Sequence, residues 1–128
     1  MDPESAECND PRTEALVHEM LGRFADRWTL IVIEVLGEGE MRFSRLQERI
    51  PGVSQKMLTK TLRQLERDGL VSRRVYAEVP TRVEYRLTEL GESFGEAVCG
   101  VWEWAAAHRI DVEEARRAFQ ARNETESA

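Results

Sequence analysis

The chain has 128 residues, of which 41% are hydrophobic and 33% are charged, and its formal net charge is -6. This length fits one domain with a sizeable core, and the composition is typical of a largely helical globular protein. No apolar run approaches the ~20 residues of a membrane helix, and the acidic start at residues 1–5 is unlike a secretory signal. We therefore expect a cytoplasmic protein with no membrane partner.

The N-terminal part of the chain predicts an arm followed by two helices. Residues 1–10 lack an apolar pattern and are expected to form a flexible arm. From Leu16 to Phe24, apolar residues recur at three- and four-residue spacing, which predicts an amphipathic helix over roughly 12–24. Asp26 is the expected N-cap of a second helix, which is apolar almost all round and therefore central to the core.

The middle of the chain predicts a turn between two further helices. Ser44–Gln47 matches a capping box, which predicts that a short helix begins there. The turn Pro51–Val53 follows, and Ser54 is the expected N-cap of a helix over 54–68 that Gly69 closes.

The remaining sequence predicts a hairpin and a long helix. Residues 70–76 and 82–87 each alternate between apolar and polar side chains, as in two paired strands. A long helix is expected from Thr88 onwards. Asp111 is the expected N-cap of a separate short helix, which together with a polar tail would make up 111–128.

This order of elements predicts a mostly α protein with a small β-hairpin, arranged as a winged helix-turn-helix. The hairpin would be the wing, and the last three of the four helices before it would form the helix-turn-helix unit. We expect this domain to occupy residues 11–110, including an N-terminal and a C-terminal helix outside the motif that serve dimerisation.

Positive charge is concentrated in the middle of this acidic chain. Residues 42–86 carry eleven Lys or Arg and five Asp or Glu, a balance of +6, whereas the remainder has a balance of -12. A basic segment inside an acidic protein indicates a polyanionic partner. In a helix-turn-helix context, the predicted polyanion is double-stranded DNA.

The helix over 54–68 divides into two faces. Leu58, Leu62 and Leu65 form a narrow apolar seam, and four cations lie opposite it: Lys56, Lys60, Arg63 and Arg67. A helix that enters the major groove needs this division, although an ordinary surface helix shows it too. The predicted DNA contacts are Arg45, Ser54, Gln55, Lys56, Thr59, Lys60, Arg63 and, from the hairpin, Arg82.

Hairpin arginines are expected to have two different roles. Arg82 is the one best placed to reach a minor groove, where the negative potential favours arginine. Arg73 and Arg86 are expected instead to pair across the strands with Glu84 or Glu78.

Five blocks of sequence carry a resemblance to a known family: Trp28–Ile31, Arg42–Leu46, Ile50–Thr59, Leu65–Val71 and Val83–Gly91. They closely resemble the HxlR-type regulators, bacterial winged-helix transcription factors related to the MarR group. The resemblance implies a dimeric cytoplasmic regulator whose first and last helices form the dimer contact. It also implies a recognition helix at 54–68 in the major groove and a wing at 71–87 at the minor groove.

From these patterns we predict a sequence-specific repressor that binds a two-fold-symmetric operator as a homodimer. The residues expected to bury the dimer interface are Leu16, Met20, Phe94, Val98, Val101 and Trp102. Trp102 and Trp104 point ~200° apart on a helix, so one would face a partner, unless both pack within the monomer. The alternative function is a winged-helix protein-interaction module that does not bind DNA directly.

The two cysteines are too few for a disulfide framework. Several regulators of the resembled family sense oxidants or electrophiles through a cysteine at the position that Ala15 occupies in this chain. Cys8 lies further upstream and is a candidate redox-sensing thiol, although an incidental exposed thiol is the favoured alternative. Cys99 is expected to be a small core or interface residue. An unidentified small molecule or electrophile would be the inducer.

No sequence pattern indicates enzyme chemistry. His18 and His108 are isolated, and no cluster of His, Cys or Asp has metal-ligand spacing. A glycine-rich phosphate loop and a nucleophile–base pair are also missing from the sequence. We therefore expect no catalytic residues, no metal and no cofactor.

Overall fold

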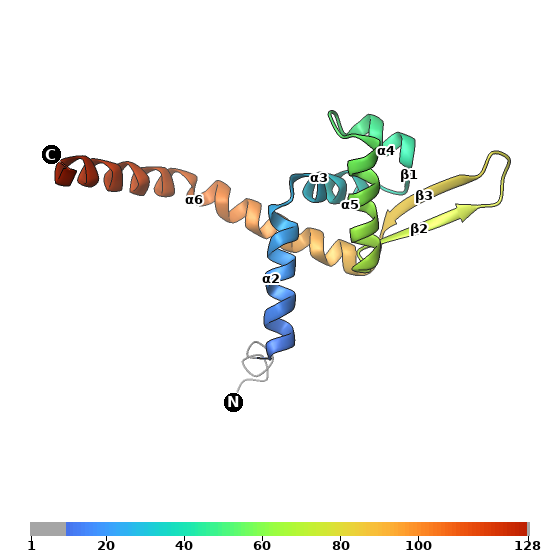
Figure 1. The fold of residues 1–128 in the computed structure, drawn as a ribbon, viewed down its shortest axis with the longest axis horizontal. Helices are drawn as coiled ribbons and strands as arrows, with labels where there is room; N and C mark the ends of the chain where they lie inside the picture. The colour runs from blue at the N-terminus through green and yellow to red at the C-terminus, as the bar shows by residue number, and fades with distance from the viewer. Residues whose placement is uncertain (1–9, 128) are drawn as a thin grey trace. The chain divides into compact units, whose positions relative to one another are not determined.

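The computed structural model describes residues 10–127, which form five helices and a small sheet (Figure 1). The elements are α2 Pro11–Ala25, α3 Arg27–Leu36, β1 Met41–Arg42, α4 Phe43–Arg49, α5 Gln55–Arg67, β2 Val71–Tyr76, β3 Arg82–Leu87 and α6 Glu89–Ser127. They divide into a compact unit that ends at Gly95 and a second unit that begins at Glu96, within α6. The predicted arm and Cys8 lie outside the described residues, except that Asp10 caps α2. No helix in the described part of the chain is both long and apolar enough to cross a membrane.

The three strands form one antiparallel sheet in the order β1-β3-β2. The predicted hairpin is confirmed, with Val71 paired to Leu87 near the core and Tyr76 paired to Arg82 near the tip. A third strand was not predicted, because the two residues of β1 carry too short a pattern to recognise. The mostly α winged helix-turn-helix fold is confirmed.

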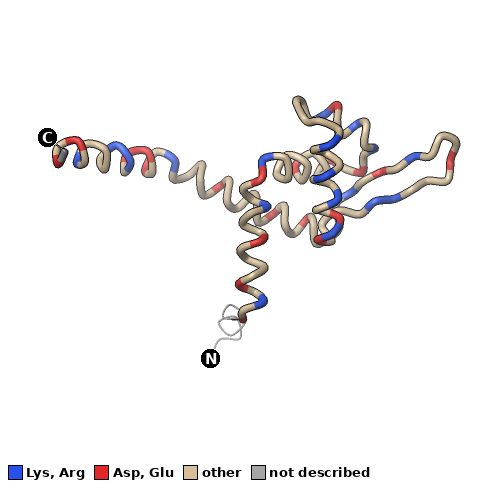
Figure 2. Tube along the Cα trace, in the orientation of Figure 1, with Lys and Arg blue, Asp and Glu red and all other residues tan. Residues whose placement is uncertain are grey.

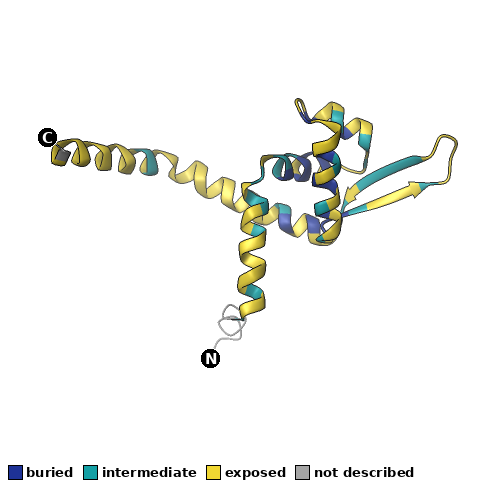
Figure 3. Cartoon of the chain, viewed as in Figure 1, coloured by how far each residue is buried: buried dark blue, intermediate teal, exposed yellow. Residues whose placement is uncertain are grey.

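Packing of α3 against α5 makes the centre of the core. The buried residues of α3 are Thr29, Val32, Ile33, Val35 and Leu36, which confirms the expected central position of this helix. Leu58, Leu62 and Leu65 of α5 are each at most 1% exposed. Helix α2, in contrast, has no buried residue, and Figure 3 shows it as mostly exposed.

Two of the four predicted helix N-caps are confirmed. The Asp26 carboxylate accepts a hydrogen bond from the Trp28 backbone N–H at 3.0 Å, and the Ser54 hydroxyl accepts one from Met57 at 3.0 Å. The predicted capping box at Ser44 is wrong, because α4 begins one residue earlier and its N-cap, Arg42, makes no side-chain cap bond. Arg42 is held extended by its pairing with β3, so the helix begins directly after the strand.

The separate C-terminal helix expected at Asp111 is also wrong. Helix α6 runs without interruption from Glu89 to Ser127, and Asp111 lies within it as an exposed residue. No Gly or Pro follows Gly100, and the segment is rich in Ala, Glu and Arg. One Asp inside such a segment costs only about 0.7 kcal/mol relative to Ala, too little to end a helix.

One aromatic expectation on α6 needs correction. Phe94 is 8% exposed and stacks on Phe24 of α2 with ring centroids 5.0 Å apart, so it belongs to the core of its own protomer. Trp102 and Trp104, in the second unit, are 66% and 59% exposed among the described residues, so both side chains are open to a contact there. Val98, in the second unit, is 9% exposed.

The start of α6 is fixed to the turn that follows α5. The Thr88 hydroxyl donates to the Gly69 carbonyl at 2.6 Å and accepts from the Gly91 backbone N–H at 3.0 Å. The backbone N–H of Thr88 also donates to the Leu70 carbonyl at 3.1 Å. Gly91 is buried, and a Cβ at this position would collide with that same Leu70 carbonyl oxygen.

Replacing Gly91 by Ala should therefore destabilise the protein by about 2 kcal/mol, because the collision exceeds the gain in helix propensity. Urea unfolding followed by circular dichroism measures the change. Ser93→Ala, at an exposed position of the same helix, is the matched control and should be neutral or slightly stabilising. Equal stability of Gly91→Ala and wild type would contradict the close approach.

Candidate nucleic-acid interface

The orientation of helix α5 is fixed by its buried apolar seam and by the turns at its two ends. The seam residues Leu58, Leu62 and Leu65 face the core, so the opposite side of the helix faces solvent. Before the helix, the turn buries Val53 at 8% exposure, and Gly52 adopts a positive φ of 85°. These contacts fix the rotation of α5 about its axis.

The basic face of α5, formed by Lys56, Lys60, Arg63 and Arg67, is exposed along the whole helix. No ion pair among residues 10–127 involves any of these four side chains. The two acids at the C-terminal end of the helix are held by arginines of other elements. Glu66 lies 3.7 Å from Arg73 of β2, and Asp68 accepts a hydrogen bond from Arg23 of α2 at 3.1 Å. No carboxylate within residues 10–127 therefore neutralises the positive charge of the basic face. Figure 2 marks the positions of the Lys and Arg residues along α5 in blue.

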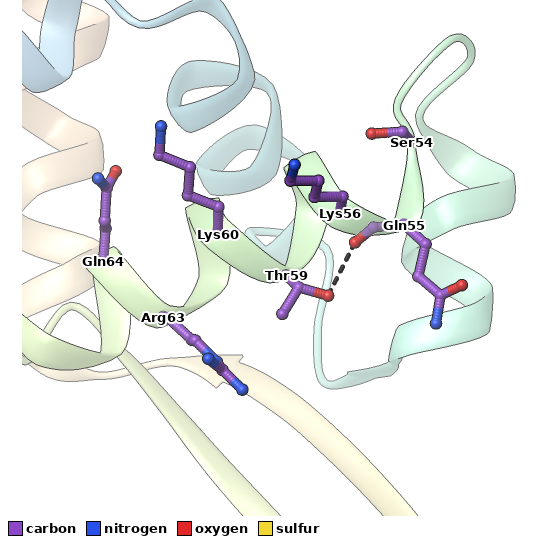
Figure 4. A pocket seen from close by; sticks show the side chains of 7 residues that line it. All are labelled: Ser54, Gln55, Lys56, Thr59, Lys60, Arg63 and Gln64. Carbon is purple, nitrogen blue, oxygen red and sulfur yellow. Dashed lines mark hydrogen bonds between the residues drawn. The ribbon is translucent and has the colours of Figure 1, made fainter.

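Polar side chains of the N-terminal half of α5 lie beside the basic face. An open hollow is lined by Ser54, Gln55, Lys56, Thr59, Lys60, Arg63 and Gln64 (Figure 4). The Thr59 hydroxyl donates to the Gln55 carbonyl at 2.8 Å, so it can still accept a hydrogen bond. The Gln55 amide extends outward with both donor and acceptor groups. The structure thus brings together all six of the residues predicted on this helix.

Arg63 lies on the hairpin side of α5, and its charge reaches Tyr85 of β3. Burial raises the pKa of the Tyr85 hydroxyl above its usual value, and the positive charges of Arg73 and Arg63 oppose that rise. The tyrosine is therefore neutral at physiological pH. The negative charge of Glu66 acts at the same point and adds to the rise of the Tyr85 pKa.

Arg45 of α4 is exposed but carries a local partner. Its guanidinium lies 3.7 Å from the Glu48 carboxylate, one helical turn away, and the Arg45 side chain is 60% exposed. An exposed pair of this kind contributes less than about 1 kcal/mol, so Arg45 can exchange Glu48 for a phosphate.

Arg49 donates to Glu38 at 2.9 Å, and this bond raises the pKa of the Arg49 guanidinium and lowers that of the Glu38 carboxyl.

The hairpin differs from the expectation at Arg82. Its guanidinium lies 3.2 Å from Glu78 and 3.5 Å from Glu84, and its side chain is only 26% exposed. The expectation of a free minor-groove arginine at this position is therefore not supported by its contacts.

The predicted pairing of Arg73 and Arg86 with Glu84 or Glu78 is wrong. Arg73 turns to Glu66 of α5, and Arg86 donates to the Ser72 hydroxyl at 3.2 Å. Sequence analysis missed the central place of Glu84, which pairs with Arg82 and lies 3.8 Å from Arg42. The alternation of β3 could have placed Glu84 on one face with Arg82, but only the register of β1 brings Arg42 to it.

Within residues 10–127, no group of three or more His, Cys, Asp or Glu side chains is placed to hold a metal ion. The chemistry of the hollow on α5 is that of cations, hydroxyls and amides, which can bind phosphates and the edges of bases. A three-helix unit with a β-hairpin wing and an exposed basic second helix of the turn defines the class of winged helix-turn-helix proteins.

Comparison with known proteins gives the family. The model of the HxlR-like helix-turn-helix family matches residues 24–113. An HTH-type transcriptional regulator of Methanothermobacter thermautotrophicus is 46% identical over 91 residues, which are 71% of this chain and 66% of that protein. The chain belongs to the HxlR-like helix-turn-helix family and is a DNA-binding transcriptional regulator.

Solved structures agree with this assignment. A transcriptional regulator of the MarR family from Enterococcus faecalis has a TM-score of 0.68 at 31% identity, covering 84% of this chain and 94% of that chain. The diamide-treated YodB from Bacillus subtilis has a TM-score of 0.65 at 37% identity, covering 77% of this chain and 93% of that chain. The regulator family disfavours the alternative of a protein-interaction module without DNA binding.

Lys60→Ala and Arg63→Ala should each weaken DNA binding and lower the slope of log affinity against log salt by about 0.9, the value for one phosphate contact. Fluorescence anisotropy over a salt series, on a duplex selected by the wild-type protein from a random pool, measures the slope. Arg12→Ala removes one positive charge from α2 that is already paired with Asp10 and should leave the slope unchanged. Unchanged slopes for both α5 variants would place the DNA contacts elsewhere.

Proposed function

We propose that the protein is a homodimeric repressor that places α5 of each protomer in the major groove of a two-fold-symmetric operator. The observation that carries this proposal is the basic face of α5, which is exposed and makes no ion pair within residues 10–127, in a chain of net charge -6. Repulsion between DNA and the acidic remainder would favour binding through this one face. The hairpin would then lie beside the flanking DNA.

The proposed base contacts are at the N-terminal half of α5, as in other helix-turn-helix proteins. Gln55 and Thr59 carry groups that match base edges, whereas Lys56, Lys60 and Arg63 have the reach and charge for phosphates or guanine. Ser54 would keep its capping bond and donate its hydroxyl hydrogen outward. Arg45 would add a phosphate contact from α4.

Dimerisation is supported by apolar side chains that no part of residues 10–127 covers. On α2, Leu16 and Leu21 are 52% and 53% exposed, and Met20 is half-buried. On the part of α6 that follows Gly95, Val101 is 55% exposed and Trp102 is 66% exposed. We propose that Leu16, Met20, Val101 and Trp102 contact the partner, whereas Phe94 and Val98 support these helices from within. Such a dimer would present its two recognition helices about 34 Å apart.

Repression is the simplest output of such a dimer, because occupancy of promoter DNA is enough to exclude the polymerase. An inducer would act by changing the spacing or angle of the two recognition helices. Two solved relatives are the diamide-treated YodB and the oxidised redox regulator HypR, which supports an electrophile as inducer. Cys8 stays a prediction for the reacting thiol, and Cys99 is free and exposed on α6.

Trp102→Glu should shift the protein from dimer to monomer at micromolar concentration, because a charge would replace a central aromatic contact and weaken association at least about tenfold. Sedimentation velocity measures the shift. Trp104→Glu is the matched control, since it changes the same residue type at similar exposure on another side of α6. A monomeric wild type would contradict the dimer, and dissociation by Trp104→Glu alone would move the interface to the other face.

Repression is tested by transcription in vitro with purified RNA polymerase on a template that carries the selected duplex across its promoter. The protein should lower transcript yield in a dose-dependent way, and the Lys60→Ala/Arg63→Ala variant should require a higher dose because it loses two contacts. A template without the selected duplex is the control. Increased transcript yield from the operator template would make the protein an activator.

A further inference from the structure

We propose that Arg74, rather than Arg82, is the DNA contact of the hairpin, and that it binds a backbone phosphate beside the groove that α5 enters. This inference rests on the proposed function and assigns a residue that the sequence analysis did not select. Its basis is the arrangement of charge on one face of the sheet. That face is formed by side chains that the register places next to one another: Arg42, Ser72, Arg74, Tyr76, Arg82, Glu84 and Arg86.

The charge of Arg82 is balanced by its neighbours. Glu78 lies 3.2 Å from one end of its guanidinium, and Glu84 lies 3.5 Å from the Nε atom. Glu84 is only 18% exposed and is shared with Arg42 at 3.8 Å. Two arginines and two carboxylates therefore form a neutral group, which offers DNA no net attraction.

Arg74 is left outside this group. It lies directly across the strands from Glu84, yet no carboxylate in the described part of the chain is within ion-pair distance of it. Glu84 instead has Arg42 and Arg82 within ion-pair distance of its Oε1 atom. Arg74 is exposed, so its charge is available to a phosphate.

Tyr76 holds Arg74 in place. The Arg74 guanidinium lies 4.9 Å from the centre of the Tyr76 ring, and the Arg82 guanidinium lies 4.0 Å from the same ring. The Tyr76 hydroxyl donates to Glu40 at 3.4 Å, so the ring is fixed from the side of β1 as well. Arg82 is thus a positioning residue that fixes the ring on which Arg74 rests, and the prior ordering of Arg74 lowers the entropy cost of binding.

The composition of the hairpin tip favours a contact of the hairpin with a backbone phosphate over a contact with a base edge. Residues 77–81 contain the acid Glu78 and no Lys or Arg. A minor groove has a strongly negative potential, which would repel a carboxylate at the leading end of the wing. Arg74 lies further back along β2, at a position that can reach the sugar–phosphate backbone while the tip stays outside the groove.

The test compares wild type with four variants of the full-length protein, the fourth being Arg74→Ala combined with Arg82→Met/Glu78→Gln. Each is measured on the duplex that wild type selects from a random pool and on an unrelated duplex. Arg74→Ala removes the proposed contact, and Arg74→Lys keeps its charge. Arg82→Met/Glu78→Gln removes one charge of each sign, so the net charge stays constant. Anisotropy titrations over a salt series give affinity and slope, and circular dichroism checks that each variant is folded.

Arg74→Ala should lower the salt slope by about 0.9, so that its deficit relative to wild type shrinks about threefold from roughly 50 to roughly 200 mM salt. The deficit should be equal on both duplexes, because a phosphate contact carries no sequence information. Arg74→Lys should keep the wild-type slope. Arg82→Met/Glu78→Gln should weaken binding at constant slope, and this loss should vanish in the Arg74→Ala background, since the ring then has no arginine to position.

A wild-type slope for Arg74→Ala, or a lost unit of slope for Arg82→Met/Glu78→Gln, would overturn the assignment while leaving the proposed function intact. A deficit confined to the selected duplex would replace the phosphate by a base edge and equally overturn it. Failure of the wild type to enrich or bind any duplex would instead be a failure of the proposed function itself.

Discussion

Burial of the leucine seam on α5 is the constraint on which the interface depends. Leu58, Leu62 and Leu65 are at most 1% exposed, and each contributes about 2 kcal/mol from burial. Turning the helix to hide its cations would expose these leucines, at a cost far above that of any single surface ion pair. The hydrophobic core therefore determines which side of α5 faces solvent, and the electrostatic interactions act on a helix that is already oriented.

The carboxylates at the end of α5 pair with arginines of other elements and leave the basic face of α5 without them. Glu66 and Asp68 lie at the end of α5 but pair with Arg73 and Arg23, which come from β2 and α2. The bond from Arg23 also ties α2, a proposed dimer helix, to the C-cap of the recognition helix. A change in the position of α2 would therefore act directly on α5, which would give an inducer bound at the proposed dimer interface a short physical route to the proposed DNA contacts.

Prediction from sequence succeeded where one local pattern determines the outcome. The hairpin, the central helix α3 and the Ser54 cap all follow from alternation, apolar periodicity or a single side-chain hydrogen bond. Prediction from sequence failed where the outcome depends on segments that are distant in the sequence. Such segments pair through their backbones or share one charged side chain. Pairing of Arg42 with β3 moved the start of α4. Glu84 lies within ion-pair distance of Arg42 and Arg82, whereas Arg74 has no ion pair among residues 10–127.

The sequence by itself determined the winged helix-turn-helix order, the family resemblance and the two faces of α5, because each is encoded in residues a few positions apart. Only the tertiary structure decided which of the cations are free. That outcome depends on the register of β1, β2 and β3 and on partners such as Arg23 and Asp68, which lie 45 residues apart in the chain. Charge partners are chosen by proximity in space, and no periodicity of the sequence records such distances.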